Sequence, residues 1–202
     1  MNTTSAVLPP RITLIITRAT LDTGWQERLR TRLGERWQTH LFFMHHGIHQ
    51  VDQAHWRDRI QPHGTASFCA HGHGLAHGPT PAPGIQPGGL ATLGRMIRDS
   101  DFTLTLPNLH WPPHPQPLPH KRIAIRLEGA PDAIVEGIRL GAGLAGCDHR
   151  VTLYHDAPLT HPFPDPARPY LEALIALGAR ILPVPAIFPD PPGEAFDLTV
   201  RL

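Results

Sequence analysis

One cysteine of the chain, Cys69, stands where a reactive group is expected. It follows a short apolar strand, predicted at residues 65–68, and opens a stretch rich in glycine and histidine, CAHGHGLAHG. Ligands and reactive groups of α/β sheets collect at the carboxyl ends of strands, and a helical turn after the cysteine would favour a thiolate over a thiol. Position alone leaves two interpretations open: a nucleophilic thiol, or a small buried hydrophobic side chain at a strand end.

Histidine is concentrated around this cysteine, with nine of the fifteen imidazoles in residues 40–77. Cys69, His71 and His73 together are a conceivable ligand set for Zn²⁺ or copper, although their spacing is that of no recognised zinc finger. Composition bias is the competing explanation for these histidines. His45 follows the second predicted strand, so we expect it at the same edge of the sheet as Cys69.

Residues 141–146 (GAGLAG) spell GxGxxG, the pattern of a dinucleotide-binding turn. That turn needs a strand before the glycines and a helix after them, whereas these glycines close a predicted helix and lead into a strand. Nucleotide binding is therefore not indicated. We expect Gly141, Gly143 and Gly146 to provide close packing and helix termination, and Cys147 to occupy a packing position.

Alternating strands and helices are expected to position these residues. Residues 11–17 (RITLIIT) form a β-branched apolar run typical of a strand buried on both faces, and residues 25–37 then show helical spacing. The further elements expected are strands at residues 40–44, 65–68 and 102–106 and an amphipathic helix at residues 89–98. This alternation predicts a parallel sheet with right-handed crossovers.

The order of elements begins again after a proline-rich segment, residues 107–119, which we interpret as a stiff extended linker. Residues 122–127 match the first strand, and residues 132–146 match the first helix. Residues 151–154, followed by His155, match residues 41–44, followed by His45. Residues 178–183 match 64–69, and residues 196–200 match 102–106. We infer an internal duplication whose second copy lacks a counterpart of residues 84–98. The competing interpretation is that any two α/β units share such an order.

Composition excludes several classes of protein. The 202 residues, 41% of them hydrophobic and 17% charged, suffice for a globular core. A net charge of +1 gives no electrostatic footprint for nucleic acid or an anionic membrane surface. Two cysteines form no disulfide framework, and the sequence has no signal-peptide pattern and no uncharged apolar run of 18 residues. We therefore expect a cytoplasmic protein that does not span a membrane.

The first copy resembles the DsrE/TusD family of small sulfur-relay proteins over about residues 11–106. Four segments carry the likeness. They are the opening strand, residues 41–48 (LFFMHHGI), which resemble the family's "FF…GV", residues 63–69 (HGTASFC), which resemble its "HG.AL..C", and residues 88–106, which resemble its closing helix and strand. The resemblance implies that Cys69 carries a persulfide. The expected counterpart of Cys69 in the second copy is Pro183, so that copy would be inactive. After the cysteine the family has a helix-forming run, whereas this chain has HGHG, a poor helix sequence.

These observations predict an α/β fold of two tandem DsrE-like units, each a parallel sheet flanked by helices, with the second reduced. The units are residues 1–106 and 120–202, joined by the linker at 107–119. They would pair within one chain, and further oligomerisation is left open.

The expected function is cytoplasmic sulfur relay without a cofactor. Cys69 would take sulfur from a donor protein and pass it to an acceptor protein, with His71, His73 or His45 stabilising the anion. The alternative is a non-catalytic binding or scaffold protein. Such a protein would hold a metal or small ligand at its histidine-rich edge, through Cys69, His71 and His73.

Overall fold

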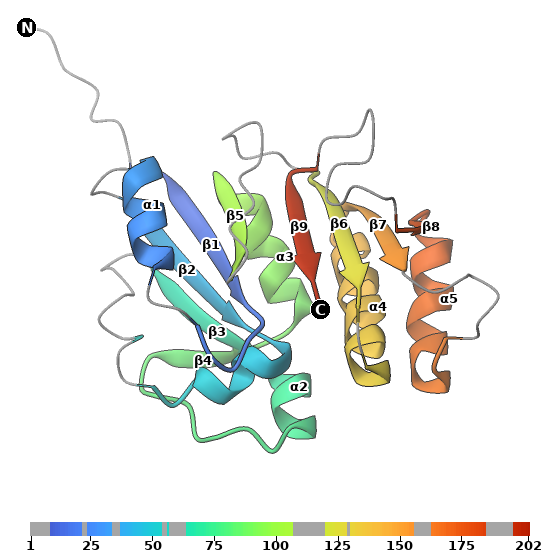
Figure 1. Ribbon diagram of the computed structural model, residues 1–202, viewed down its shortest axis with the longest axis horizontal. Coiled ribbons are helices and arrows are strands. Elements are labelled where there is room, and N and C mark those ends of the chain that lie inside the picture. Colours follow the sequence, from blue (N-terminus) through green and yellow to red (C-terminus); the bar gives the residue numbers. More distant parts are fainter. Residues whose placement is uncertain are drawn as a thin grey trace, which may run out of the picture.

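Two parallel β-sheets flanked by helices form the protein (Figure 1). This computed structural model describes residues 9–21, 24–33, 37–53, 56, 64–106, 120–128, 130–155, 163–184 and 196–202. The predicted α/β fold class is confirmed, with one parallel sheet in each half of the chain. The predicted linker at residues 107–119 lies outside the described residues.

The first sheet has five strands. Its elements in chain order are β1 (Arg11–Ile16), α1 (Trp25–Leu33), β2 (Gln38–Phe43), the 3-10 helix η1 (His45–Gln50), β3 (Thr65–Cys69), α2 (Ala70–Leu75), β4 (Ile85–Gly88), α3 (Leu90–Asp99) and β5 (Phe102–Leu106). The strand order is β4-β3-β2-β1-β5. Strand β1, between β2 and β5, is buried on both faces, as its β-branched sequence predicts, because α1 packs on one face of the sheet and α3 on the other.

The second sheet has four strands in the order β8-β7-β6-β9. Its elements are β6 (Arg122–Leu127), α4 (Pro131–Ala145), β7 (Arg150–His155), the 3-10 helix η3 (Asp165–Ala167), α5 (Arg168–Ala176), β8 (Arg180–Pro183) and β9 (Leu198–Arg201). The order is that of the first sheet without β4, which agrees with a reduced second copy. Both described helices, α4 and α5, pack in the cluster on one face of this sheet. No helix in the described ranges is long and apolar enough to cross a membrane.

The same pair of hydrogen bonds opens both sheets. In the first sheet, the Arg11 N–H donates to the Asp101 carboxylate at 2.7 Å, and the Asp101 N–H donates to the Arg11 oxygen at 2.9 Å. In the second sheet, Arg122 and Asp197 exchange the equivalent bonds, each at 2.8 Å. The repeat makes Arg122 the counterpart of Arg11, in agreement with an internal duplication.

This register corrects two of the predicted matches. His155 pairs with Leu127 at the end of β6, just as Phe43 pairs with Ile16 at the end of β1. The counterpart of His155 is therefore Phe43, not His45, which lies two residues further along.

A similar shift applies to the cysteine. Pro183 pairs with His155 as Phe68 pairs with Phe43, so Val184 and not Pro183 takes the place of Cys69. Strand pairing fixes these positions, whereas the sequence match rested on short apolar runs that fit equally well when shifted by one or two residues.

One apolar cluster is shared by the two sheets, while a second lies within the first half alone. Strands β5 and β9 lie side by side, and the Thr105 hydroxyl donates to the Thr199 oxygen across them at 3.1 Å. Helix α3 packs against α4, so that a single apolar cluster contains side chains from both halves, including Phe42, Leu93, Ile125 and Leu153. In Figure 1 the helices α3, α4 and α5 lie behind the two sheets as one layer.

Glycines allow the helices of this layer to approach each other. A Cβ on Gly141 would lie 2.5 Å from Leu174 of α5, and one on Gly143 would lie 2.5 Å from Leu90 of α3. The predicted close-packing role is confirmed for these two. Gly146 is the C-cap of α4, which confirms its predicted role in helix termination, and it ends the helix with an ordinary right-handed φ of −65°.

Candidate functional site

Cys69 ends β3 and caps the helix that follows it. Its Sγ accepts a hydrogen bond from the backbone N–H of Gly72 at 3.4 Å. The next six residues, AHGHGL, form α2 despite their two glycines, so a helical turn does follow the cysteine. Within α2, all of which is described, no residue is buried. This helix therefore has little packing to stabilise it.

The thiol itself is enclosed, since Cys69 is 0% exposed. It belongs to the shared apolar cluster, together with Phe42 and Met44 from the end of β2. Of the two interpretations left open by the sequence, this burial agrees with the small buried side chain at a strand end, and a nucleophilic role would need the sulfur to become exposed. The reason for the burial is tertiary, because α4 of the second half packs against the carboxyl end of the first sheet, and no local pattern around the cysteine encodes that contact.

A guanidinium group faces the buried sulfur. Arg139, from α4, donates a hydrogen bond from Nη2 to Cys69 Sγ at 3.1 Å. The same guanidinium binds both carboxylate oxygens of Glu136, at 2.6 and 2.8 Å. Burial acts to lower the pKa of Arg139, but the hydrogen bond and charge of Glu136, aided by Cys69, outweigh it and raise the pKa. Arg139 is thus a permanent cation beside the thiol.

Sequence reasoning missed Arg139 and Glu136. They lie three residues apart in a helix that is otherwise mainly apolar and rich in glycine. A charge pair at this spacing in such a stretch is the signal that would have found them, because buried charges need partners. The meeting of this pair with a cysteine 70 positions away follows only from the tertiary fold.

His45, His46 and Asp132 gather at the same end of the strands. His45 and His46 open η1, directly after β2, and their ring centroids lie 4.0 Å apart. Asp132 lies in the first turn of α4, and a ligating atom from each of the three residues lies within 4.8 Å of the others. Burial and the neighbouring His46 lower the pKa of His45, against the opposing charges of Glu136 and Asp132.

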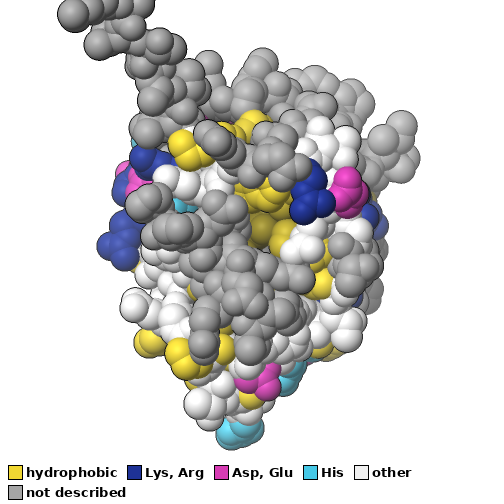
Figure 2. All heavy atoms as spheres, turned by 90° about the vertical axis from the view of Figure 1, so that its left-hand side faces the viewer, with side chains coloured by type: hydrophobic (Ala, Val, Ile, Leu, Met, Phe, Trp, Pro, Cys, Tyr) yellow, Lys and Arg dark blue, Asp and Glu magenta, His cyan; other side chains and the backbone are white. Residues whose placement is uncertain are grey.

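His71 and His73 do not join Cys69 in a ligand set. His71 is exposed on α2. His73 Nε2 lies 2.9 Å from the Pro79 oxygen, and its ring packs 4.7 Å from Phe68. In the described part of the chain, the group of three possible metal ligands that converge is His45, His46 and Asp132. Figure 2 shows imidazoles at the lower tip of the molecule, the end at which Figure 1 draws α2.

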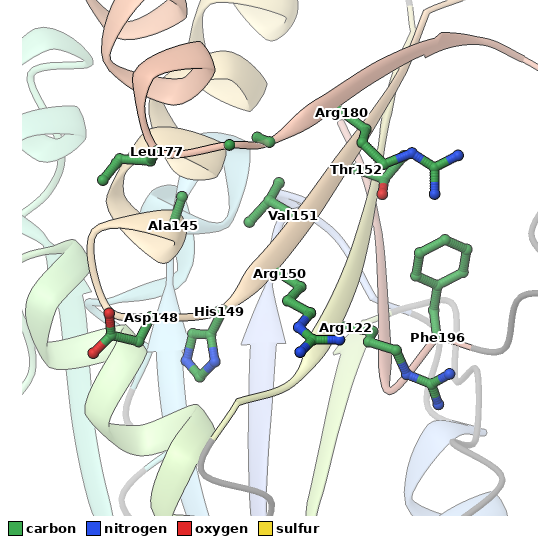
Figure 3. A pocket seen from close by; sticks show the side chains of 12 residues that line it. Arg122, Ala145, Asp148, His149, Arg150, Val151, Thr152, Leu177, Arg180 and Phe196 are labelled. Carbon is green, nitrogen blue, oxygen red and sulfur yellow. The ribbon is translucent and has the colours of Figure 1, made fainter.

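Two cavities lie away from the thiol. One, of about 570 Å³, opens at the amino ends of β6, β7 and β8. Figure 3 shows Arg122, Arg180 and Phe196 on one side of it and Asp148 and His149 on the other. A second, of about 500 Å³, lies at the amino ends of the first sheet. Cys69 is not among the described residues that line either cavity.

Comparison with known proteins identifies no family. No protein-family model and no curated protein matches the chain. Among solved structures, 1-deoxy-D-xylulose 5-phosphate reductoisomerase from Zymomonas mobilis is similar at 16% identity over 88% of this chain, with a TM-score of 0.33. This chain covers 39% of the reductoisomerase.

Two decarboxylase structures are similar at the same level. An FMN-dependent cysteine decarboxylase from thioviridamide biosynthesis shares 12% identity over 85% of this chain and 88% of its own, with a TM-score of 0.32. An FMN-dependent UbiX-like decarboxylase from Escherichia coli O157:H7 shares 12% identity over 90% of this chain and 86% of its own, with a TM-score of 0.28. Neither cofactor nor activity is carried over to this chain from such a likeness.

Proposed function

We propose that this protein is a cytoplasmic, DsrE-like sulfur-relay protein that accepts persulfide sulfur on Cys69 and passes it on. The observation that best supports this function is the hydrogen bond from Arg139 to the sulfur, at 3.1 Å in a buried setting. A guanidinium that donates a hydrogen bond to sulfur interacts favourably with the negative charge that the sulfur carries when it attacks or leaves. Glu136 holds the guanidinium in position, while Nη2 still donates to the sulfur. The thiolate is the form that attacks sulfur.

The proposed reaction transfers one sulfur atom. The Cys69 thiolate attacks the outer sulfur of a donor persulfide, R–S–SH. A bond forms between Sγ and that sulfur, the S–S bond of the donor breaks, and the donor leaves as R–S⁻. An acceptor thiolate then attacks the outer sulfur of Cys69–S–SH, and the Cys69 thiolate leaves beside Arg139. The exchange has no net oxidation or reduction and needs no cofactor.

Access to the buried sulfur requires part of the protein to move, and we assign this movement to α2. The helix has six residues, two of them glycine, and none is buried. Glycine inside a helix costs about 1 kcal/mol relative to alanine, so α2 is the element near Cys69 that opens with the least free energy. Its opening would remove the Gly72 contact and expose Sγ without disturbing the core between the sheets.

The test is sulfur loading followed by intact mass. Wild type is incubated with glutathione persulfide, and we expect it to gain one sulfur atom. Cys69→Ser should gain none, whereas Cys147→Ser, the matched control at the other free cysteine, should load like wild type. Arg139→Gln should load more slowly than wild type, whereas the exposed Arg98→Gln should load at the rate of wild type. A wild type that never gains sulfur, or a Cys69→Ser variant that gains as much, overturns the relay.

A binding or scaffold protein is the second candidate, and the full burial of Cys69 favours it. In that case the contact between Arg139 and Cys69 serves only to fasten α4 to the first sheet. The same assay separates the two functions. A scaffold takes up no sulfur on Cys69, but Cys69→Ser still lowers its thermal stability.

A further inference from the structure

Three potential ligands from the two halves of the chain meet at the carboxyl end of the first sheet. His45 and His46 come from η1 of the first half, and Asp132 comes from the first turn of α4 in the second half. One ligating atom of each lies within 4.8 Å of the other two. Two imidazole nitrogens and one carboxylate oxygen form the donor set of many three-residue zinc sites.

The His45 ring interacts with the backbone of Thr17, yet one of its nitrogens is left without a hydrogen bond. Its Nε2 is buried and has no hydrogen-bond partner among the described residues. Its backbone has a φ of +51°, a conformation that residues other than glycine rarely adopt and that often marks functional positions. A buried ring nitrogen without a partner costs free energy, and a bound cation would remove that cost.

We propose that His45, His46 and Asp132 bind one divalent transition-metal ion, with Zn²⁺ as the ion that suits the donors best. Zinc takes histidine nitrogen and carboxylate oxygen at about 2.0–2.2 Å. Binding would require the three atoms to come closer together, and His46 and Asp132 are both exposed, so little packing opposes rotation of their side chains. Three protein ligands leave a further coordination position open to water or another ligand.

The metal would tie the two halves of the protein together. Its ligands belong to η1 of the first half and to α4 of the second half. A ligand that binds only the folded state stabilises it in proportion to its affinity and concentration, so zinc should raise the melting temperature. Cys69, Arg139 and Glu136 are not among its ligands, and the inference does not depend on the proposed sulfur relay.

The experiment is a titration of untagged, chelator-treated protein. ZnCl₂ is titrated by calorimetry, and CoCl₂ is followed through its visible absorption bands. We expect one equivalent to bind with high affinity and to raise the melting temperature. His46→Ala and Asp132→Asn should each weaken binding about tenfold or more and remove the rise. Both side chains are exposed, so these variants should fold like wild type.

His71→Ala and Cys69→Ser are the controls, because they alter the ligand set predicted from the sequence. Both should bind zinc like wild type. Failure of wild type to bind, or equal binding by His46→Ala, overturns the proposal. So does loss of binding in either control, which would assign the metal to Cys69 and His71. Zinc binding by Cys69→Ser also separates this test from sulfur loading, since that variant lacks the relay thiol.

Discussion

The only lysine of the chain, Lys121, is buried between the two halves. Its Nζ donates a hydrogen bond to the Ser100 oxygen at 2.7 Å, which links the start of β6 to the end of α3. Its backbone N–H donates to His149 Nδ1 at 3.2 Å, and His149 Nε2 lies 3.3 Å from the Gly94 oxygen. These contacts satisfy buried polar groups where the two halves meet, so hydrogen bonds as well as apolar packing fix how the halves are joined.

The burial of Lys121 predicts a pH dependence of stability. Burial lowers its pKa from 10.5 to about 8, against the opposing charges of Asp197, Asp101 and Asp99. Between these values the unfolded chain holds a proton that the folded protein has released, so the free energy of unfolding rises with pH. The contribution of Lys121 to the free energy of unfolding is fully present above about pH 10.5 and is lost as the pH falls through about 8.

Denaturant unfolding of wild type and Lys121→Met at pH 8 and pH 10 measures this effect. We expect the stability of wild type relative to the variant to increase by about 2 kcal/mol between the two pH values. Tyrosines and cysteines titrate in both proteins and cancel in the difference. A difference that is constant with pH would show that Lys121 keeps its proton in the folded state.

The residues of the candidate site differ in how far the sequence predicted them. Cys69 was found because a strand and a change in composition mark its position. Arg139 was missed because its role depends on a contact between the two halves. His71 and His73 were misplaced as ligands because nearness in sequence to Cys69 did not bring their rings to the sulfur.

At the scale of elements, α4 connects the parts of the molecule. It packs against α3, α5, β6 and β7, and it supplies both Arg139 and Asp132. The sequence predicted this helix well, because proline at its start and apolar spacing through its length are strong signals. Its glycines predicted close packing, but nothing in the sequence showed that α3 and α5 would be the helices packed there.

The short helix α2 provides a test of how Cys69 becomes accessible. A Cβ on Gly74 would meet no atom within 4 Å, so Gly74→Ala should fit without strain. Alanine stabilises a helix by about 1 kcal/mol relative to glycine, which lowers the population of open α2 roughly fivefold. We therefore expect Gly74→Ala to load sulfur on Cys69 about fivefold more slowly than wild type.

The matched control for α2 is Gly89→Ala, at the start of α3, where a Cβ also has open space. This variant should load at the rate of wild type. The rate of alkylation of Cys69 by iodoacetamide gives an independent reading, because it needs the same opening and no persulfide. If Gly74→Ala reacts as fast as wild type in both assays, access to the sulfur does not depend on α2.

At the scale of the whole molecule, the two halves repeat each other and yet depend on each other. The repeated bonds of Arg11 with Asp101 and of Arg122 with Asp197 open two sheets with the same strand order. The sequence predicted this repetition from the order of its apolar runs. The two units were also expected to pair, but the sequence did not show that one apolar cluster would run through both, because the faces that meet carry no pattern distinct from an ordinary buried face.

The shared core predicts that the halves do not fold alone. Residues 1–106 and 120–202, produced separately, would each expose their part of the common cluster, including Leu93 and Ile97 in the first and Ile138 and Leu144 in the second. Loss of this burial removes much of the apolar area that stabilises each half. We expect neither fragment to show a cooperative thermal transition in circular dichroism, whereas an equimolar mixture of the two should recover one near that of the intact chain. Two fragments that each unfold cooperatively would instead be independent domains. The buried contact of Arg139 with Cys69 would then be an interface between two stable domains and not part of one cooperative folding unit.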